Sequence, residues 1–252
     1  IFDINEIKEI NFDFIIISNP TKFHNEALKQ ALYFECPIFI EKPVLYDLEL
    51  ADEFINTIKD KKIITYVACN LRFNKTIVKL KELLKLKTVG KIYEVSIYCG
   101  SNVSEWRPNQ EKSDLINTVN LSGGVNIDLI HELDYAYWFF GLPIKVNLFT
   151  KKVSDLEIDV PDYANFILDY KFFPVNVSLN YFRNDYKRTV EIVGSKGTIY
   201  ADLSLNQIKL NHNIIFSENV DDIYYTYYEQ MKYFINVIKE KKQSMNTFLD
   251  GV

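Results

Sequence analysis

The chain has 252 residues, and its composition excludes several classes of protein. Hydrophobic residues make up 48% and charged residues 25%, a balance typical of a globular protein and too apolar for a disordered one. The net charge is −5 and the basic residues are scattered rather than gathered in a stripe, which argues against a nucleic-acid partner. No apolar run approaches the ~20 residues that cross a bilayer, and no basic segment followed by an apolar one opens the chain. We therefore expect a cytoplasmic protein with no nucleic-acid and no membrane partner.

The cysteines and histidines give no sign of a metal site. Cys36, Cys69 and Cys99 are odd in number, lie in or beside apolar stretches and form no C-x-x-C pair. This pattern favours buried reduced thiols over disulfides, which suits the cytoplasm. No cluster of His, Cys, Asp and Glu has metal-ligand spacing, so we expect no metal.

Strands and helices alternate over the first 70 residues. Residues 14–18 form a short apolar run that ends at the turn signal Asn19-Pro20, which is typical of a buried parallel strand. Strands separated by helices of this length predict right-handed crossovers and a parallel sheet. The elements expected after the first strand are a helix from residue 21, a strand at 38–40, a helix at 45–58 and a strand at 63–68.

After residue 72 the pattern changes to extended segments that follow one another closely. Short turns such as 194–197 separate them, which indicates an antiparallel or mixed sheet. The helices expected here are 75–86, 127–140 and 221–239, and the strands are 91–99, 144–150, 164–170, 175–181, 188–193 and 198–203. We therefore expect two domains, residues 1–72 and residues 73–252.

The fold class expected from this order is α/β. An open parallel sheet that binds a dinucleotide has two βαβαβ halves, and its Gly-rich phosphate loop belongs to the first. No G-x-G-x-x-G occurs in this sequence. We therefore expect residues 1–72 to be the C-terminal part of a Rossmann dinucleotide-binding domain whose first half lies upstream. Residues 73–252 would form an α+β domain with an open, mostly antiparallel sheet.

The most specific chemical signal is Glu41-Lys42-Pro43 at the end of a predicted parallel strand. Ligands of such sheets bind outside the carboxyl ends of the strands, so Lys42 would reach the binding cleft. Proline fixes the backbone after it and holds the preceding residue extended. A partly desolvated lysine can exchange protons with a substrate hydroxyl. The alternative is a surface lysine at the end of a strand.

Other motifs accompany Glu41-Lys42-Pro43 in a fixed order. They are Ser18-Asn19-Pro20-Thr21 with His24, then Asn70-Leu71-Arg72-Phe73, then Trp106-Arg107-Pro108, and then the run from Gly123 to Asp134 that contains Asp128 and His131. With these motifs, from about residue 12 to about residue 203, the sequence resembles the glucose-fructose oxidoreductase, inositol dehydrogenase and MocA family. The resemblance implies a dinucleotide fold followed by an α+β domain whose open sheet often serves oligomerisation.

The resemblance also implies roles for individual residues. It makes Lys42, Asp128 and His131 the catalytic residues, with His131 as the proton acceptor, and NAD or NADP the cofactor. The residues implied to bind the cofactor are Ser18, Asn19, Pro20, Thr21, His24, Glu41, Lys42, Pro43, Asn70, Arg72, Trp106 and Arg107. For His24 the alternative is an exposed helix residue, and for Trp106 and Arg107 it is ordinary loop packing.

The spacing of the aspartate and histidine departs from the family pattern. Many members place the histidine four residues after the aspartate, whereas His131 follows Asp128 by three. Both spacings put the pair on one face of a helix. Asp134, three residues beyond His131, is then a second candidate for orienting the imidazole. A structural histidine satisfied by either carboxylate is the alternative to catalysis.

The expected function is transfer of a hydride between nicotinamide and a sugar or nucleotide-sugar hydroxyl or ketone. The expected partners are that small-molecule substrate and further copies of the chain, which would associate through the C-terminal sheet. A non-catalytic NAD(P)-binding sensor is one alternative. An enzyme that cleaves glycosides by transient oxidation with tightly held NAD is the other.

Overall fold

The computed structural model describes residues 9–106, 111, 114, 116, 118–120, 123–219 and 223–252. The chain divides into two compact units. The first comprises Ile1–Asn70 and Tyr227–Val252, and the second Leu71–Thr226. The boundary near residue 70 lies close to the one we expected, but the C-terminal residues that we had assigned to the second domain belong with the first unit.

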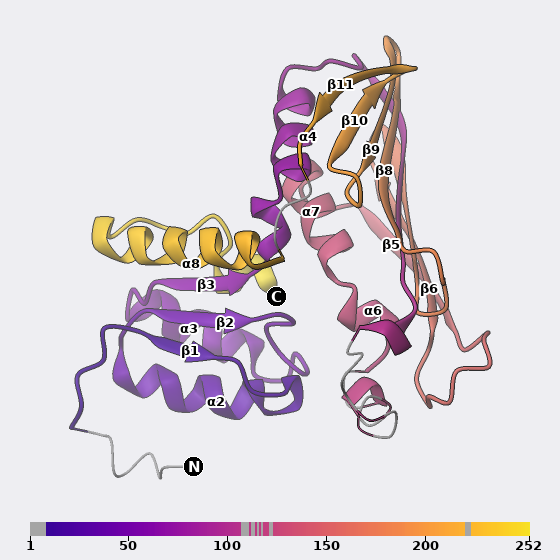
Figure 1. Cartoon of the computed structure of the whole chain (residues 1–252). Coiled ribbons are helices and arrows are strands. Elements are labelled where there is room, and N and C mark those ends of the chain that lie inside the picture. Colours follow the sequence, from indigo (N-terminus) through magenta and orange to yellow (C-terminus); the bar gives the residue numbers. More distant parts are fainter. Residues whose placement is uncertain are drawn as a thin grey trace. The chain divides into compact units, whose positions relative to one another are not determined.

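The first unit is built on a parallel sheet of three strands in the order β1-β2-β3 (Figure 1). Ile15 pairs with Ile38 in β1 and β2, and Ile38 pairs with Thr65 in β3. The expected parallel sheet with crossover helices is confirmed. The elements in chain order are β1 Ile15–Ile17, η1 Thr21–Phe23, α2 His24–Ala31, η2 Leu32–Phe34, β2 Ile38–Glu41, α3 Ala51–Asp60 and β3 Thr65–Ala68.

Helices cover both faces of this sheet because its strand side chains are apolar on both sides. Ile38 and Ile40 of β2 are fully buried in a core that includes Leu28 of α2 and Phe54 of α3. Phe39, between them, points to the opposite face, where its ring centroid lies 5.4 Å from that of Phe234 in α8 (Ile223–Glu240). An apolar strand buried on both faces is typical of parallel sheets.

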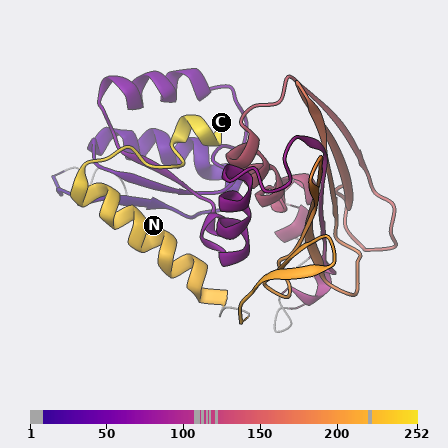
Figure 2. The same cartoon turned by 90° about the horizontal axis from the view of Figure 1, so that it is seen from above.

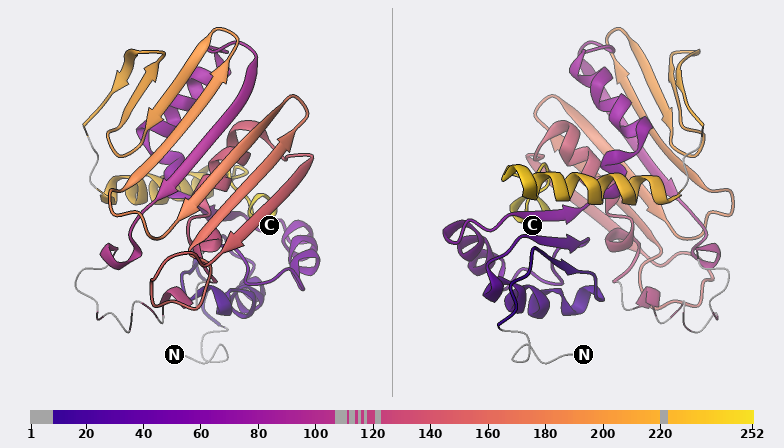
Figure 3. Two further views of the ribbon diagram at one scale, coloured as in Figure 1. Left: turned by 90° about the vertical axis from the view of Figure 1, so that its right-hand side faces the viewer. Right: turned by 60° about the vertical axis from the view of Figure 1, so that its left-hand side comes forward.

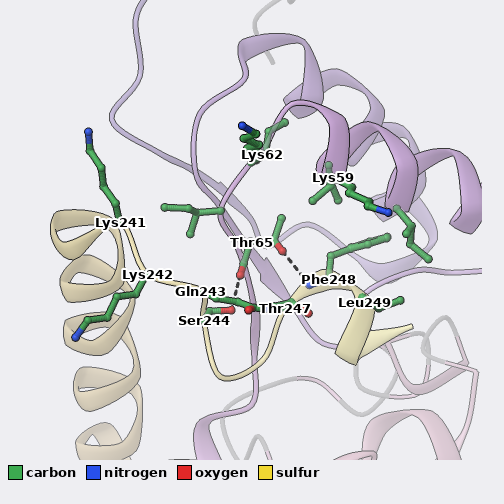
Figure 4. A pocket seen from close by; sticks show the side chains of 14 residues that line it. Lys59, Lys62, Thr65, Lys241, Lys242, Gln243, Ser244, Thr247, Phe248 and Leu249 are labelled. Atoms are coloured by element: carbon green, nitrogen blue, oxygen red, sulfur yellow. Dashed lines mark hydrogen bonds between the residues drawn. The ribbon is translucent and has the colours of Figure 1, made fainter.

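The C-terminal segment runs along the outer edge of β3, which explains why it belongs with the first unit. Ser244 Oγ donates to Thr65 O at 2.6 Å, and Asn246 Nδ2 donates to Val67 O at 2.8 Å. Val67 N donates in turn to Asn246 O at 2.9 Å. Figure 4 shows Ser244 and Phe248, the first residue of α9 (Phe248–Gly251), both bonded to Thr65. These bonds pair backbone groups that a free strand edge would leave open.

Helix α3 begins at Ala51, six residues after the start we expected. Asp47 accounts for the difference, because its Oδ1 accepts from Glu49 N at 3.1 Å and from Asn25 Nδ2 at 3.0 Å. An aspartate that bonds the backbone two residues ahead holds a turn and competes with the helix. Leu45, which we placed at the helix start, is instead buried in the core of the unit together with Val44.

The second unit contains an eight-stranded sheet in the order β11-β10-β9-β8-β4-β7-β6-β5. All neighbouring strands are antiparallel except β4 and β7, so the expected open, mostly antiparallel sheet is confirmed. The strands are β4 Ile92–Gly100, β5 Lys145–Lys151, β6 Tyr163–Tyr170, β7 Phe173–Asn180, β8 Lys187–Gly194, β9 Gly197–Asp202, β10 Gln207–Leu210 and β11 Asn213–Ser217. We did not expect β10 and β11, which form a hairpin around Asn211 and His212.

Helices pack on one face of this sheet. They are α4 Lys75–Lys85, α6 Val125–Asp128 and α7 His131–Phe140, with short 3-10 turns at η3 Asn70–Phe73 and η4 Val103–Glu105. Val95, Ile97 and Cys99 of β4 alternate into the core beneath them. Figure 2 shows the sheet along its edge with helices on one side only, and the left view of Figure 3 shows the opposite face, which no helix among the described residues covers. Nor is any helix in the described part of the chain long and apolar enough to cross a membrane.

The helix that we expected over residues 127–140 is broken into α6 and α7. Leu129 has φ −91° and ψ 36°, outside the helical region, so α6 ends at Asp128 and α7 begins at His131. The inference that Asp128 and His131 share a face of one helix is therefore wrong. Neither Gly nor Pro marks the break, so its cause lies in the contacts of the residues on either side.

Candidate active site

The three parallel strands bring several predicted site residues to one edge of the first unit. Ser18-Asn19-Pro20-Thr21 follows β1, Glu41-Lys42-Pro43 closes and follows β2, and Asn70 follows β3. Because the strands are parallel neighbours, their carboxyl ends meet at this edge. This is the edge at which open α/β sheets bind their ligands.

His24 ties two of these segments together. It is the first residue of α2 and only 1% exposed. Its Nδ1 lies 2.8 Å from Pro43 O, and its Nε2 lies 2.9 Å from Asn19 O. The alternative of an exposed helix residue is therefore wrong.

Glu41 and Lys42 are both half-buried at this edge. Burial raises the pKa of the Glu41 carboxyl, although the charges of Lys42 and His24 and a backbone hydrogen bond act in the opposite direction. The peptide bond between Lys42 and Pro43 is cis. The charge of Lys42 thus acts on the Glu41 carboxyl in a partly desolvated environment.

In the second unit Asp128 belongs to a cluster with two aromatic residues. Tyr181 is fully buried and its hydroxyl donates to Asp128 Oδ2 at 2.5 Å. The ring of Trp106 meets that of Tyr181 edge-on at 5.4 Å, and Trp106 Nε1 donates to Ser101 Oγ at 2.7 Å. The structure therefore brings Trp106 and Asp128 together through Tyr181, a residue that we had not singled out. The other predicted residue of that segment, Arg107, lies outside the described residues.

Replacing Tyr181 with phenylalanine should destabilise the second unit. A hydrogen bond to a charged group contributes about 1.5–3 kcal/mol, and we expect a loss of that size in the free energy of unfolding. Both tryptophans of the sequence, Trp106 and Trp138, lie in this unit, so tryptophan fluorescence during urea unfolding reports on it alone. Tyr93→Phe, at a residue 52% exposed on β4, is the control and should change the value by less than about 0.5 kcal/mol. Equal losses in the two variants would contradict the role given to the Tyr181 hydroxyl.

A buried ion pair fixes the first turn of α7, where His131 lies. Glu132 has no exposed side-chain surface, and its Oε1 lies 2.8 Å from Nε of Arg188 on β8. The Tyr135 hydroxyl donates to the same oxygen at 3.3 Å. Burial opposes the charge on Arg188, but the attraction of the Glu132 carboxylate, with smaller contributions from Cys99, Tyr186 and Tyr135, outweighs it and raises the pKa of Arg188 well above its ordinary value. Together with the bond from Tyr181 to Asp128, this pair anchors the chain on both sides of the break between α6 and α7.

Asp134 is engaged elsewhere. Arg72 donates to it through Nε at 3.0 Å and through Nη2 at 2.7 Å, with only 1% of the arginine side chain exposed. Lys81 of α4 lies over the ring of Trp138 at 3.3 Å, and burial with the nearby charges of Arg72 and Lys85 lowers the pKa of Lys81 to about 8. These contacts join α4 to α7. They engage Asp134, the second candidate for orienting His131, and they give Arg72 a structural partner beside its expected role in cofactor binding.

The three cysteines are free and buried, as expected. Burial, with the charge of Glu132, raises the pKa of the Cys99 thiol to about 12. Burial also raises the pKa of Cys36. A thiol with a raised pKa is a poor nucleophile, so neither cysteine is a candidate for the chemistry.

A cavity of about 560 Å³ lies elsewhere in the first unit, beside the start of β3 (Figure 4). Ile63, Thr65 and Phe248 contribute to its lining, and Lys241 and Lys242 lie at its rim with side chains that point away from it. It opens near the amino end of β3, whereas ligands of parallel sheets bind at the carboxyl ends. The cavity is therefore not the predicted cofactor site.

Two family models match successive parts of the chain. Residues 3–69 match an oxidoreductase family with an NAD-binding Rossmann fold, and residues 77–200 match the GFO/IDH/MocA C-terminal domain. The chain belongs to the glucose-fructose oxidoreductase, inositol dehydrogenase and MocA family. Membership confirms the α/β fold class, with a Rossmann domain of the NAD-binding type that precedes a mostly antiparallel sheet.

Relatives in this family include characterised enzymes. The chain is 28% identical over 204 residues to the myo-inositol 2-dehydrogenase of Thermotoga maritima, an alignment that covers 78% of the chain and 58% of that enzyme. It is 25% identical over 135 residues to the 2,7-anhydro-N-acetylneuraminate hydratase of Mediterraneibacter gnavus, which covers 53% of the chain and 35% of that enzyme. The chain thus matches little more than half the length of the first of these relatives.

Solved structures of the family show the same fold. A probable dehydrogenase from Thermotoga maritima superposes with a TM-score of 0.79 at 23% identity, over 98% of this chain and 77% of that one. The WlbA dehydrogenase from Bordetella pertussis, in complex with NADH and UDP-GlcNAcA, superposes with a TM-score of 0.78 at 16% identity, over 99% of this chain and 76% of that one.

Proposed function

We propose that the protein containing this chain is an NAD(P)-dependent dehydrogenase that moves a hydride between nicotinamide and a sugar, inositol or nucleotide-sugar carbinol. The observation that carries the proposal is the gathering of the Ser18–Thr21 and Glu41–Pro43 segments at the carboxyl edge of a parallel sheet, within an NAD-binding family. The names of relatives that act on inositol, or were crystallised with NADH and a nucleotide sugar, support the substrate class.

The chain offers residues for each task. Ser18 to Thr21, His24, Glu41 to Pro43 and Asn70 fit a cofactor at the carboxyl edge of the first unit, and Arg72, Trp106 and Arg107 complete the set that we propose. Bound nicotinamide would supply the hydride acceptor. Lys42 holds the substrate hydroxyl and shares its proton, while His131 accepts that proton as the carbinol is oxidised. Asp128, held by the Tyr181 hydroxyl, orients the imidazole of His131.

A second candidate reaction uses the same residues without net oxidation. One relative is named a hydratase, a reaction without net oxidation. Transient oxidation of the substrate by tightly held NAD, as in the glycoside-cleaving alternative, would likewise leave no net reduced nicotinamide. The two reactions differ in a simple measurement. A dehydrogenase releases reduced nicotinamide in proportion to its product, whereas the transient reaction consumes its substrate with no net change in nicotinamide.

The partners proposed are a small sugar-like substrate and further copies of the chain, in the cytoplasm. The face of the eight-stranded sheet opposite its helices carries exposed apolar residues on its β5 and β6 strands, Phe149 and Ile167. Exposed apolar patches of this kind mark contact surfaces. Light scattering of the whole protein at several concentrations measures the assembly.

The role of His131 is tested by the pH dependence of turnover. If His131 accepts the substrate proton, oxidation requires its neutral form, so the rate should rise with pH as His131 loses its own proton. His131→Asn should remove that rise and lower the rate by about 10²- to 10⁴-fold. His212→Asn, in the hairpin turn between β10 and β11, is the matched control and should leave the profile unchanged. A His131→Asn variant with an unaltered rate and profile would move the proton step to Lys42.

A further inference from the structure

One side chain joins the two loops that bear the proposed site of the first unit. His24 opens α2, the helix that follows the loop after β1, and both of its ring nitrogens lie within hydrogen-bond distance of a backbone carbonyl. One carbonyl is that of Asn19, in the loop after β1. The other is that of Pro43, in the loop after β2, directly beyond Lys42.

In both contacts the histidine ring must be the hydrogen-bond donor. A carbonyl oxygen only accepts, so each bond needs a proton on the ring nitrogen that makes it. The neutral ring carries one such proton and the protonated ring carries two. The bond to Pro43 therefore forms with the proton on Nδ1, and both bonds form together when the ring carries both protons. Because His24 is buried, a carbonyl that lost its donor would find little water to replace it.

We propose that His24 is a positioning residue that fixes the backbone bearing Lys42 by bonding Pro43 O, and that anchors this loop to the loop after β1 through Asn19 O. The direction in which the Lys42 side chain points depends on the conformation of the backbone at residues 42 and 43. The bond from His24 to Pro43 O restricts that conformation. The claim that this position of Lys42 matters for turnover rests on the proposed function. The claim that His24 fixes the loop does not depend on it.

The two bonds can be removed one at a time. The side-chain amide nitrogen of asparagine takes about the place of Nδ1, and that of glutamine about the place of Nε2. His24→Asn therefore keeps the donor to Pro43 and loses the donor to Asn19, whereas His24→Gln does the reverse. His24→Leu removes both donors at similar bulk.

The readout is the rate at which formaldehyde and a mild reductant methylate the Lys42 amine in the folded 252-residue chain, followed by mass spectrometry of peptides. Lys59, exposed on the outer side of α3, is the internal reference for the reagent and for folding. We expect Lys42 to react about five- to tenfold faster in His24→Gln and His24→Leu than in the parent chain, because a lost buried hydrogen bond frees the loop. In His24→Asn the rate should stay within about twofold of the parent chain.

Equal Lys42 rates in the parent chain and all three variants would overturn the proposal, as would a His24→Asn variant that reacts as fast as His24→Gln. In the whole protein, kcat should be about tenfold lower in His24→Gln than in His24→Asn. If the methylation rates follow the prediction and kcat is unchanged in every variant, the positioning of the loop stands and the catalytic role of Lys42 fails.

Discussion

Lys42→Ala should lower turnover of the whole protein by about 10²- to 10⁴-fold, the effect typical of a lost acid/base group. The residue lies at the carboxyl end of β2, half-buried next to Glu41, on backbone whose following carbonyl is held by His24. Alanine keeps this backbone and removes only the amine, so the fold should survive. Steady-state kinetics with the variant and the parent protein measure the loss.

Two further variants test whether Lys42 acts through its exchangeable proton rather than its charge, and whether the loss is specific to this lysine. Lys42→Arg keeps the positive charge but holds its proton at any working pH, so it should be nearly as slow as Lys42→Ala. Lys59→Ala removes an exposed lysine of the same unit and should turn over normally. Near-normal turnover of Lys42→Ala would refute the assignment, and a fast Lys42→Arg variant would reduce the role of Lys42 to binding.

The second large effect concerns stability. Arg188→Met should lower the free energy of unfolding of the second unit by about 3–5 kcal/mol, because it leaves the Glu132 carboxylate buried without its cation. Tryptophan fluorescence during urea unfolding measures the loss, since Trp106 and Trp138 both lie in this unit. Arg188→Met combined with Glu132→Met removes both charges and should recover most of the loss.

The control for the Arg188 and Glu132 variants is an exposed ion pair on the same unit. Lys79 and Glu82 on α4 lie 3.0 Å apart with 36% and 55% of their side chains exposed, and such pairs contribute about 0–1 kcal/mol. Lys79→Met should therefore have little effect. A loss in Arg188→Met no larger than in Lys79→Met would show that the buried pair does not hold α7.

The parallel half of the fold could be predicted from the sequence because its signals are local. Apolar runs that end in Asn19-Pro20 or Lys42-Pro43 identify β1 and β2, and the motifs at their ends place residues at one edge of the sheet. The start of α3 could not be predicted, since Asp47 forms a turn that hydrophobic spacing does not reveal. The place of residues 227–252 depends on bonds to β3 between residues nearly 180 positions apart in the sequence.

In the second unit, too, long-range contacts limited what could be predicted, here at the candidate catalytic residues Asp128 and His131. Its sequence predicts a helix through Asp128 and His131, because nothing local marks the break at Leu129. Tyr181, directly after β7, contacts Asp128 on one side of the break, and Arg188 of β8 contacts Glu132 on the other, contacts that form only in the folded sheet. Asp134, the second candidate for orienting His131, is bound by Arg72, which lies 62 positions away in the sequence. The residue types of the candidate site could be predicted from the motifs, but the partners of its two carboxylates required the tertiary structure.

The central claim is that the whole protein oxidises a sugar-like alcohol with nicotinamide, and the direct test is the absorbance of reduced nicotinamide. The purified protein is incubated with NAD or NADP and a panel of inositols, sugars and nucleotide sugars. We expect at least one substrate to yield reduced nicotinamide in proportion to its ketone product, with the signal lost in Lys42→Ala. Product formed without net reduced nicotinamide would contradict the dehydrogenase and favour transient oxidation, and bound cofactor with no turnover of any substrate would favour a sensor.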